Sequence, residues 1–161
     1  MPVQSFPMDR EGQAALAEYG LEGAAISGCQ IRCYEEGEDI LREGEPIESL
    51  LLVRHGRAKV CINARNGRHL IICYYISSGI LGDVELLTES PAMNTVTALS
   101  PVRCVTIPVE QNRETLLGCP AFVLRMGREV SGKLRHSSHA YILSALYTSD
   151  ERLCSYLLMA E

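Results

Sequence analysis

The sequence predicts an α+β fold: an antiparallel β-roll or jelly-roll barrel of the double-stranded β-helix kind, with short N-terminal helices before it and one long C-terminal helix after it. From about residue 30 to Pro108, short runs of Val, Ile, Leu, Tyr and Cys are separated by glycines. Short strands with turn residues between them are typical of antiparallel rolls and barrels. After Pro108 the glycines become sparse and apolar residues recur with a helical period, which predicts helices.

The length and charge of the chain limit what it can do. It has 161 residues, with 15 basic and 20 acidic side chains and a formal net charge of −5. A chain of this size buries one core without covalent staples. Its negative charge disfavours the attraction to phosphates on which nucleic-acid binding depends, so we expect these residues alone to bind DNA poorly.

Cysteine usage and hydropathy indicate a compartment. The seven cysteines are odd in number and scattered, and no cleavable signal peptide precedes them. This pattern predicts reduced thiols in the cytoplasm. The longest apolar runs, such as 50–53, fall far short of the roughly 18 residues that a membrane span needs, so no membrane association is expected.

Local signals place the first helix and one hairpin. Asp9 is a candidate N-cap for a short helix that ends near Gly20. Asn66-Gly67 predicts a two-residue hairpin turn. Such a turn needs a positive φ at both positions, and Asn-Gly adopts this conformation readily.

Two helices are expected after the strands. Residues 111–117 predict a short one, and Cys119-Pro120 is well suited to begin a longer one that runs to about Tyr147. Apolar and small residues recur along it in a 3-4 repeat for about four heptads, namely Val123, Gly127, Val130, Leu134, Ser137, Tyr141, Ser144 and Thr148. Two interpretations stay open: the stripe pairs two subunits of a homodimer, or the helix lies on its own barrel.

The last residues restart a helix. A hydroxyl or Asp cap within 148–150 precedes Glu151 in the first turn. The chain then stops within this helix, and about ten residues form a marginal helix alone in water. We therefore expect this segment to belong to something larger.

Three segments carry a resemblance to a known family. They are Ile40-Leu41-Arg42-Glu43-Gly44-Glu45, Leu51-Leu52-Val53-Arg54-His55-Gly56-Arg57-Ala58-Lys59-Val60 and Gly79-Ile80-Leu81-Gly82-Asp83-Val84-Glu85-Leu86-Leu87. In order and spacing they resemble the strand-to-turn segment, the central hairpin and the entrance to the phosphate cassette of Crp/Fnr transcription regulators. The cassette most resembles that of the YeiL-type members.

The resemblance implies a domain plan. Residues 1–118 would form a cyclic-nucleotide-binding-like sensory barrel, residues 119–147 a long dimerisation helix, and residues 148–161 a hinge and the start of a winged helix-turn-helix domain. Arg152-Leu153 and Leu157-Leu158 match the family's pattern for the first helix of that domain. A recognition helix for the major groove would need several dozen further residues. The resemblance therefore implies DNA binding only through a C-terminal domain that the chain lacks.

The resemblance also implies where an effector would bind. A pocket for a cyclic phosphate needs backbone N–H groups, a cation, and a carboxylate for the ribose hydroxyl. Gly82, Asp83 and Val84 would form the turn, and Asp83 stands where nucleotide-binding members carry the longer Glu. Glu85 is either a substitute for it or a repulsive neighbour.

The cation is not supplied by the matched motif. Nucleotide-binding members read Pro-Arg-Ser-Ala, whereas this chain reads Pro91-Ala92-Met93-Asn94. A guanidinium–phosphate pair stabilises a complex by about 2–3 kcal/mol, so Ala92 in place of Arg weakens binding by roughly a hundredfold. With Met93 in place of Ser, the pocket suits a less anionic molecule. We therefore expect cyclic AMP to bind weakly, and the effector stays unknown.

Two serines on the long helix allow two interpretations. With Cys119-Pro120 aligned to the start of the family's long helix, Ser137 and Ser138 fall where cyclic-AMP-binding members place the hydroxyl pair that meets the adenine. Either an effector bridges the pocket and the helix at these serines, or they fill a small gap between helices.

Metal, haem and catalytic alternatives are less favoured. Cys29 and Cys33 would lie about 13 Å apart along a strand, too far to share an ion, and His69 and Cys73 have the same spacing. His136 and His139 share a helix side without an evident third ligand. We therefore predict no metal site, iron-sulfur cluster or haem, and the absence of a nucleophile–base constellation predicts no enzyme.

Two further alternatives to an effector-binding regulator remain. One is a degenerate sensory domain that binds no nucleotide and serves as a dimerisation scaffold, or that senses redox state through Cys33, Cys73 or Cys104. The other is the cyclic-nucleotide regulatory domain of another signalling protein, such as a kinase or channel. The uninterrupted helix after the barrel and the Arg-Leu…Leu-Leu pattern argue against the second.

Overall fold

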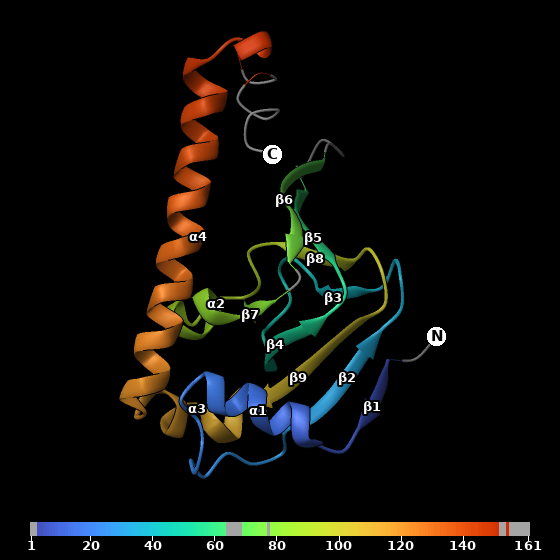
Figure 1. Cartoon of the computed structure of the whole chain (residues 1–161), viewed down its shortest axis with the longest axis vertical. Coiled ribbons are helices and arrows are strands. Elements are labelled where there is room, and N and C mark those ends of the chain that lie inside the picture. The colour runs from blue at the N-terminus through green and yellow to red at the C-terminus, as the bar shows by residue number, and fades with distance from the viewer. Residues whose placement is uncertain (1–2, 64–68, 77, 152–153, 155–161) are drawn as a thin grey trace. The chain divides into compact units, whose positions relative to one another are not determined.

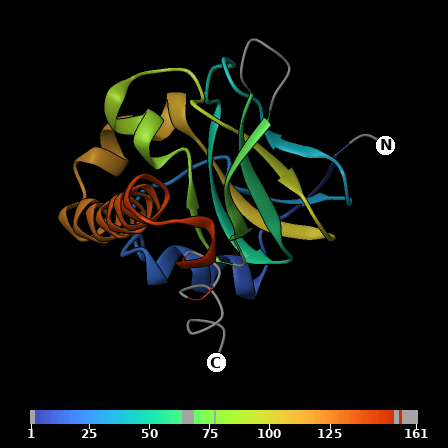
Figure 2. The same ribbon diagram turned by 90° about the horizontal axis from the view of Figure 1, so that it is seen from above.

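The computed structural model describes residues 3–63, 69–76, 78–151 and 154 of the chain. They fall into two compact units, Met1–Glu129 and Val130–Glu161 (Figure 1). The first unit holds every strand that the structure describes, in two antiparallel sheets. In Figure 2 these strands lie together, with the three short helices outside them.

The larger sheet has five strands in the order β1-β2-β9-β4-β7. Every neighbouring pair in it is antiparallel. Its strands are β1 (Gln4–Phe6), β2 (Gln30–Tyr34), β9 (Val102–Pro108), β4 (Ser49–His55) and β7 (Gly79–Leu81).

The smaller sheet has four strands in the order β3-β8-β5-β6. They are β3 (Asp39–Leu41), β8 (Thr95–Ala98), β5 (Ala58–Asn63) and β6 (His69–Ile76). Asn63 pairs with His69 across β5 and β6, whereas the Asn66-Gly67 turn predicted between them lies outside the described residues. The two antiparallel sheets confirm the predicted fold class.

The helices are α1 (Arg10–Glu18), α2 (Asp83–Thr88), α3 (Val109–Leu117) and α4 (Pro120–Leu146). The predicted cap of α1 is confirmed, since Asp9 Oδ1 accepts the N–H of Gly12 at 2.8 Å. The start of α4 at Pro120 is confirmed as well. Helix α3 begins two residues earlier than the predicted Gln111, because it follows β9 directly and the Val109 N–H is satisfied by the carbonyl of Glu48 at 2.9 Å. No helix in the described part is both long and apolar enough to cross a membrane.

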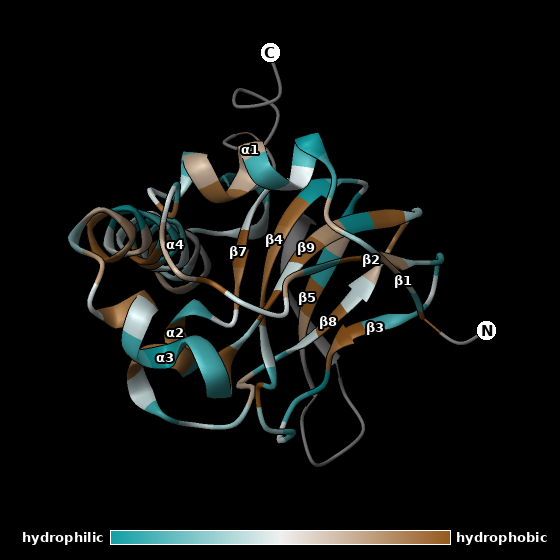
Figure 3. Ribbon diagram, turned by 90° about the horizontal axis from the view of Figure 1, so that it is seen from below, coloured by the Kyte–Doolittle hydropathy of each residue, from teal (hydrophilic) through white to brown (hydrophobic). Residues whose placement is uncertain are grey.

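Strand β4 divides the interior into two apolar clusters, because alternate side chains of a strand point to opposite faces. Leu50 and Leu52 join a cluster with residues of α1, α3 and α4, whereas Leu51 and Val53 join one formed between the two sheets. Figure 3 shows the apolar residues that run along β4 and β9. Phe122 of α4 is fully buried in the first cluster.

The second unit contains the rest of α4 and a turn into a further helix. The Glu151 carboxylate accepts the N–H and the hydroxyl of Thr148 at 2.8 and 2.9 Å, and the Glu151 N–H donates back to the Thr148 hydroxyl at 3.4 Å. These bonds form a capping box and lower the pKa of Glu151. The predicted helix restart is confirmed; the residues 152–153 and 157–158 that match the family's pattern lie outside the described residues.

Candidate effector site

A glycine in the left-handed region shapes the entrance to the phosphate cassette. Gly82 caps α2 with a φ of 85°, a conformation that costs other residues free energy. A Cβ at this position would lie 3.1 Å from Cγ2 of Ile47. Only glycine fits this turn without a shift of its neighbours.

The predicted ribose carboxylate lies inside the unit. Asp83 begins α2 and its residue surface is only 2 % exposed. Its charge acts on Tyr19, whose pKa is raised to about 12 by burial first, then by Glu129 and by Asp83 itself. Asp83 is therefore part of the buried structure beneath α2.

Glu85 closes the cassette on itself. Its Oε1 accepts the backbone N–H of Met93 at 3.1 Å, so the structure brings Glu85 and Met93 into contact. The Met93 side chain is 60 % exposed and points away from the interior. A backbone donor at the position expected to meet a ligand is thus occupied by the chain's own carboxylate.

Ala92 is fixed by the segment across from it. Its N–H donates to the carbonyl of Glu45, and its carbonyl accepts the N–H of Gly44, both at 2.8 Å. Its residue surface is 4 % exposed. The nearby guanidinium of Arg113 is bound to Glu89 at 2.6 Å. Ala92 itself supplies no cation, and the guanidinium of Arg113 is already paired.

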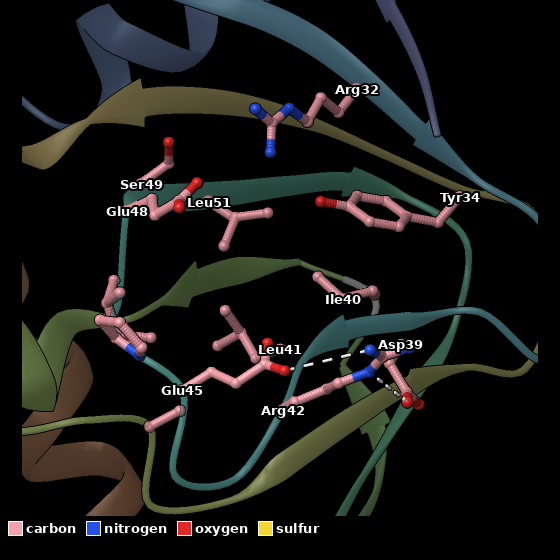
Figure 4. Close-up of a pocket in the computed structure, with 13 residues that line it drawn as sticks. Arg32, Tyr34, Asp39, Ile40, Leu41, Arg42, Glu45, Glu48, Ser49 and Leu51 are labelled. Carbon is pink, nitrogen blue, oxygen red and sulfur yellow. Dashed lines mark hydrogen bonds and ion pairs between the residues drawn. The ribbon is translucent and has the colours of Figure 1, made fainter. Parts of the chain in front are cut away.

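A cavity of about 520 Å³ adjoins the cassette at Ala92. Figure 4 shows side chains from β2, from β3 and from the segment before β4 around it. Its lining consists of Arg32, Tyr34, Asp39, Ile40, Leu41, Arg42, Glu45, Pro46, Ile47, Glu48, Ser49, Leu51 and Ala92. The sequence analysis did not single out Arg32, Tyr34 or Glu48, although the i, i+2 spacing of the first two on a strand signals that they share a face.

Burial separates two faces at the beginning of α4. Phe122 and Met126 are fully buried, whereas Val123 is 37 % exposed. Further along the predicted stripe, Leu134 and Tyr141 are 67 % and 72 % exposed. The pairing of this stripe with a second copy stays a prediction.

The two serines assigned to the effector are also exposed. Ser137 and Ser138 lie on α4 in the second unit. Their approach to the cassette stays a prediction, as does the assignment of the other cassette residues to an effector pocket.

The thiols differ in burial. Burial raises the pKa of Cys104 to about 12 and also raises that of Cys29, which lowers their thiolate fraction and reactivity at neutral pH. The side chains of His69 and Cys73 lie outside those that the structure describes. Among the described residues, no group of three or more His, Cys, Asp or Glu side chains is placed to hold a metal ion.

Comparison with known proteins identifies the family. The sequence model of the cyclic nucleotide-binding domain family matches residues 31–117, more than half of the chain. The chain belongs to this family.

The curated relatives are regulators of the Crp/Fnr type, which confirms the expected resemblance. The transcriptional activator Anr of Pseudomonas protegens is 27% identical over 79% of this chain and 52% of its own length. The regulatory protein YeiL of Escherichia coli O157:H7 is 24% identical over 76% of this chain and 56% of its own length. The chain thus spans about half the length of the curated relatives it matches.

Solved structures confirm the fold. FixK2 from Bradyrhizobium japonicum superposes with a TM-score of 0.69 at 19% identity, covering 82% of this chain and 65% of that one. A cyclic nucleotide-binding domain from Methylobacillus flagellatus gives a TM-score of 0.74 at 15% identity, covering 91% and 92%.

Proposed function

We propose that this chain is the effector-sensing and dimerisation part of a cytoplasmic, non-catalytic Crp/Fnr-type transcription regulator, and that it does not bind cyclic AMP tightly. One observation carries the second half of the proposal: Glu85 Oε1 accepts the Met93 N–H at 3.1 Å, next to an alanine at position 92. A phosphate at this place would have to displace a carboxylate and would meet its negative charge.

The exposed stripe on α4 supports a homodimer. Leu134 is a large apolar side chain that is 67 % exposed on this helix, and apolar residues repeated at 3-4 spacing pair helices. In the regulator, an effector that favours one packing of the paired helices would reorient the DNA-binding domains. The net charge of −5 supports assigning DNA contact to residues outside this chain.

The second candidate function is a sensory domain that binds no nucleotide and serves as a dimerisation scaffold. The Met93 N–H supports it, because Glu85 already accepts this hydrogen bond. Its thiol-redox form is less favoured, since Cys104 is fully buried and its pKa is raised to about 12. A buried, protonated thiol reacts slowly with oxidants.

Calorimetric titration tests the nucleotide half of the proposal. We expect cyclic AMP and cyclic GMP to give little or no heat at micromolar protein. Tight binding of either nucleotide would contradict the role given to Ala92 and Glu85.

Light scattering after gel filtration tests the dimer half. We expect a mass near twice 17.7 kDa. Leu134→Glu places a charge in the paired stripe and should raise the dimer dissociation constant by more than about a hundredfold. The matched control is Leu146→Glu, because Leu146 is 76 % exposed and its spacing places it off the stripe. A monomeric wild type, or equal loss in both variants, would contradict the assignment.

A further inference from the structure

The cavity beside the cassette contains two opposite charges that do not pair. Within the part of the chain that the structure describes, neither Arg32 nor Glu48 forms an ion pair, although both line this cavity. Figure 4 shows the Arg32 guanidinium turned from β2 toward the side where Glu48 and Ser49 lie. Opposite charges that face one cavity without meeting leave room for an occupant between them.

The other charged side chains of the cavity contact one another. Arg42 Nε lies 3.1 Å from Asp39 Oδ2, and its Nη1 lies 4.0 Å from Glu45 Oε1. These contacts leave Arg32 and Glu48 as the groups able to bind charge. A ligand with one sign of charge would satisfy one of them and repel the other.

The remaining walls combine hydroxyls with apolar surface. Tyr34 is buried and its pKa is raised, chiefly by burial and against the effect of the neighbouring Arg32. Ser49 adds a second hydroxyl. Ile40 and Leu51 are at most 7 % exposed and form an apolar floor. A volume of about 520 Å³ lies within the range of small-molecule sites.

We propose that this cavity binds a small zwitterion, of the class of α-amino acids with an apolar side chain. Arg32 would receive the carboxylate, Glu48 the ammonium group, and Ile40 and Leu51 the side chain. Because the Ala92 N–H donates to the carbonyl of Glu45, which lines the cavity, at 2.8 Å, an occupant would also act on the cassette. Binding here goes beyond the proposed function and would stand whether or not the chain regulates transcription.

Titration of the whole chain with three matched probes tests the site, by calorimetry and by NMR shifts of the cavity residues. The probes are L-leucine, 4-methylpentanoate, which lacks the ammonium group, and 3-methylbutylamine, which lacks the carboxylate. We expect L-leucine to bind at least about tenfold more tightly than either, because each loses one charge-assisted contact. Equal binding of all three, or no binding of L-leucine at millimolar concentration, would overturn the proposal.

Substitutions locate the site and assign its two ends. Arg32→Gln should weaken L-leucine about tenfold or more and leave 3-methylbutylamine unaffected, whereas Glu48→Gln should weaken L-leucine and spare 4-methylpentanoate. Arg10→Gln and Glu36→Gln are the matched controls, since both side chains are exposed and neither lines the cavity. Unchanged affinity in Arg32→Gln and Glu48→Gln would overturn the assignment, and thermal unfolding checks that both variants fold.

Discussion

The cassette and helix α4 differ in whether the groups expected to bind another molecule are already bonded within the chain. In the cassette, Glu85 binds the Met93 N–H and Ala92 is bonded to its neighbours, so the groups that would meet a phosphate are satisfied within the chain. On α4, Phe122 is buried in the first unit, whereas Leu134 in the second unit is 67 % exposed, and we propose that this exposed residue meets a partner. The difference supports the proposal that the chain pairs with a second copy and binds cyclic AMP weakly.

The largest expected effect tests the anchored face of α4. Phe122→Ala removes a fully buried ring from the core and should lower the free energy of unfolding by about 3–5 kcal/mol, through lost burial and the cavity left behind. Urea unfolding at a fixed protein concentration measures it. Leu124→Ala is the control, because Leu124 is 59 % exposed and should cost less than about 1 kcal/mol. Equal losses would mean that α4 is not anchored by one face.

The second prediction concerns the cassette, where three substitutions should raise the affinity for cyclic AMP. Ala92→Arg with Met93→Ser supplies the cation and hydroxyl of the nucleotide-binding motif, and Glu85→Ala releases the Met93 N–H. We expect the triple variant to bind cyclic AMP about a hundredfold more tightly than the wild type in calorimetry, equivalent to about 2–3 kcal/mol. Ala92 lines the cavity, so an arginine there has space to extend.

The double variant that keeps Glu85 is the matched control. Its carboxylate still occupies the Met93 N–H and repels the phosphate, so the gain should be smaller. If the double and triple variants bind equally, Glu85 has no part in excluding the nucleotide.

These features differ in how far the sequence predicts them. The start of α4 was predictable because Pro120 is compatible with a first helical turn, and Ala92 could be read directly against a linear motif. The hydrogen bond between Glu85 and Met93 could not be predicted, because it depends on how the seven residues between them fold back. The cavity could not be predicted either, since Arg32 on β2 and Glu48 just before β4 come to the same cavity only because both strands pair with β9 between them.

The smallest expected effect concerns the anchorage of α4 at alkaline pH. Arg125 of α4 lies 5.2 Å above the ring of Tyr19, which is 3 % exposed. Burial first, then Glu129, raises the pKa of Tyr19 to about 12 from an ordinary value near 10. The folded state therefore holds this proton more tightly than the unfolded state. The contribution of the protonated Tyr19 to the free energy of unfolding is fully present below pH 10 and is lost as the pH rises towards 12.

Tyr19→Phe should remove that loss, which amounts to about 2 kcal/mol across the interval. Urea unfolding at pH 8, 10 and 11 should show a flatter decline for the variant than for the wild type. A decline remains in both, because the pKa of Cys104 is also raised to about 12. Tyr147→Phe, at a ring that is 45 % exposed, should behave as the wild type does. Identical slopes in all three proteins would show that Tyr19 has the same pKa in the folded and the unfolded chain. Its burial would then contribute nothing to the anchorage of α4.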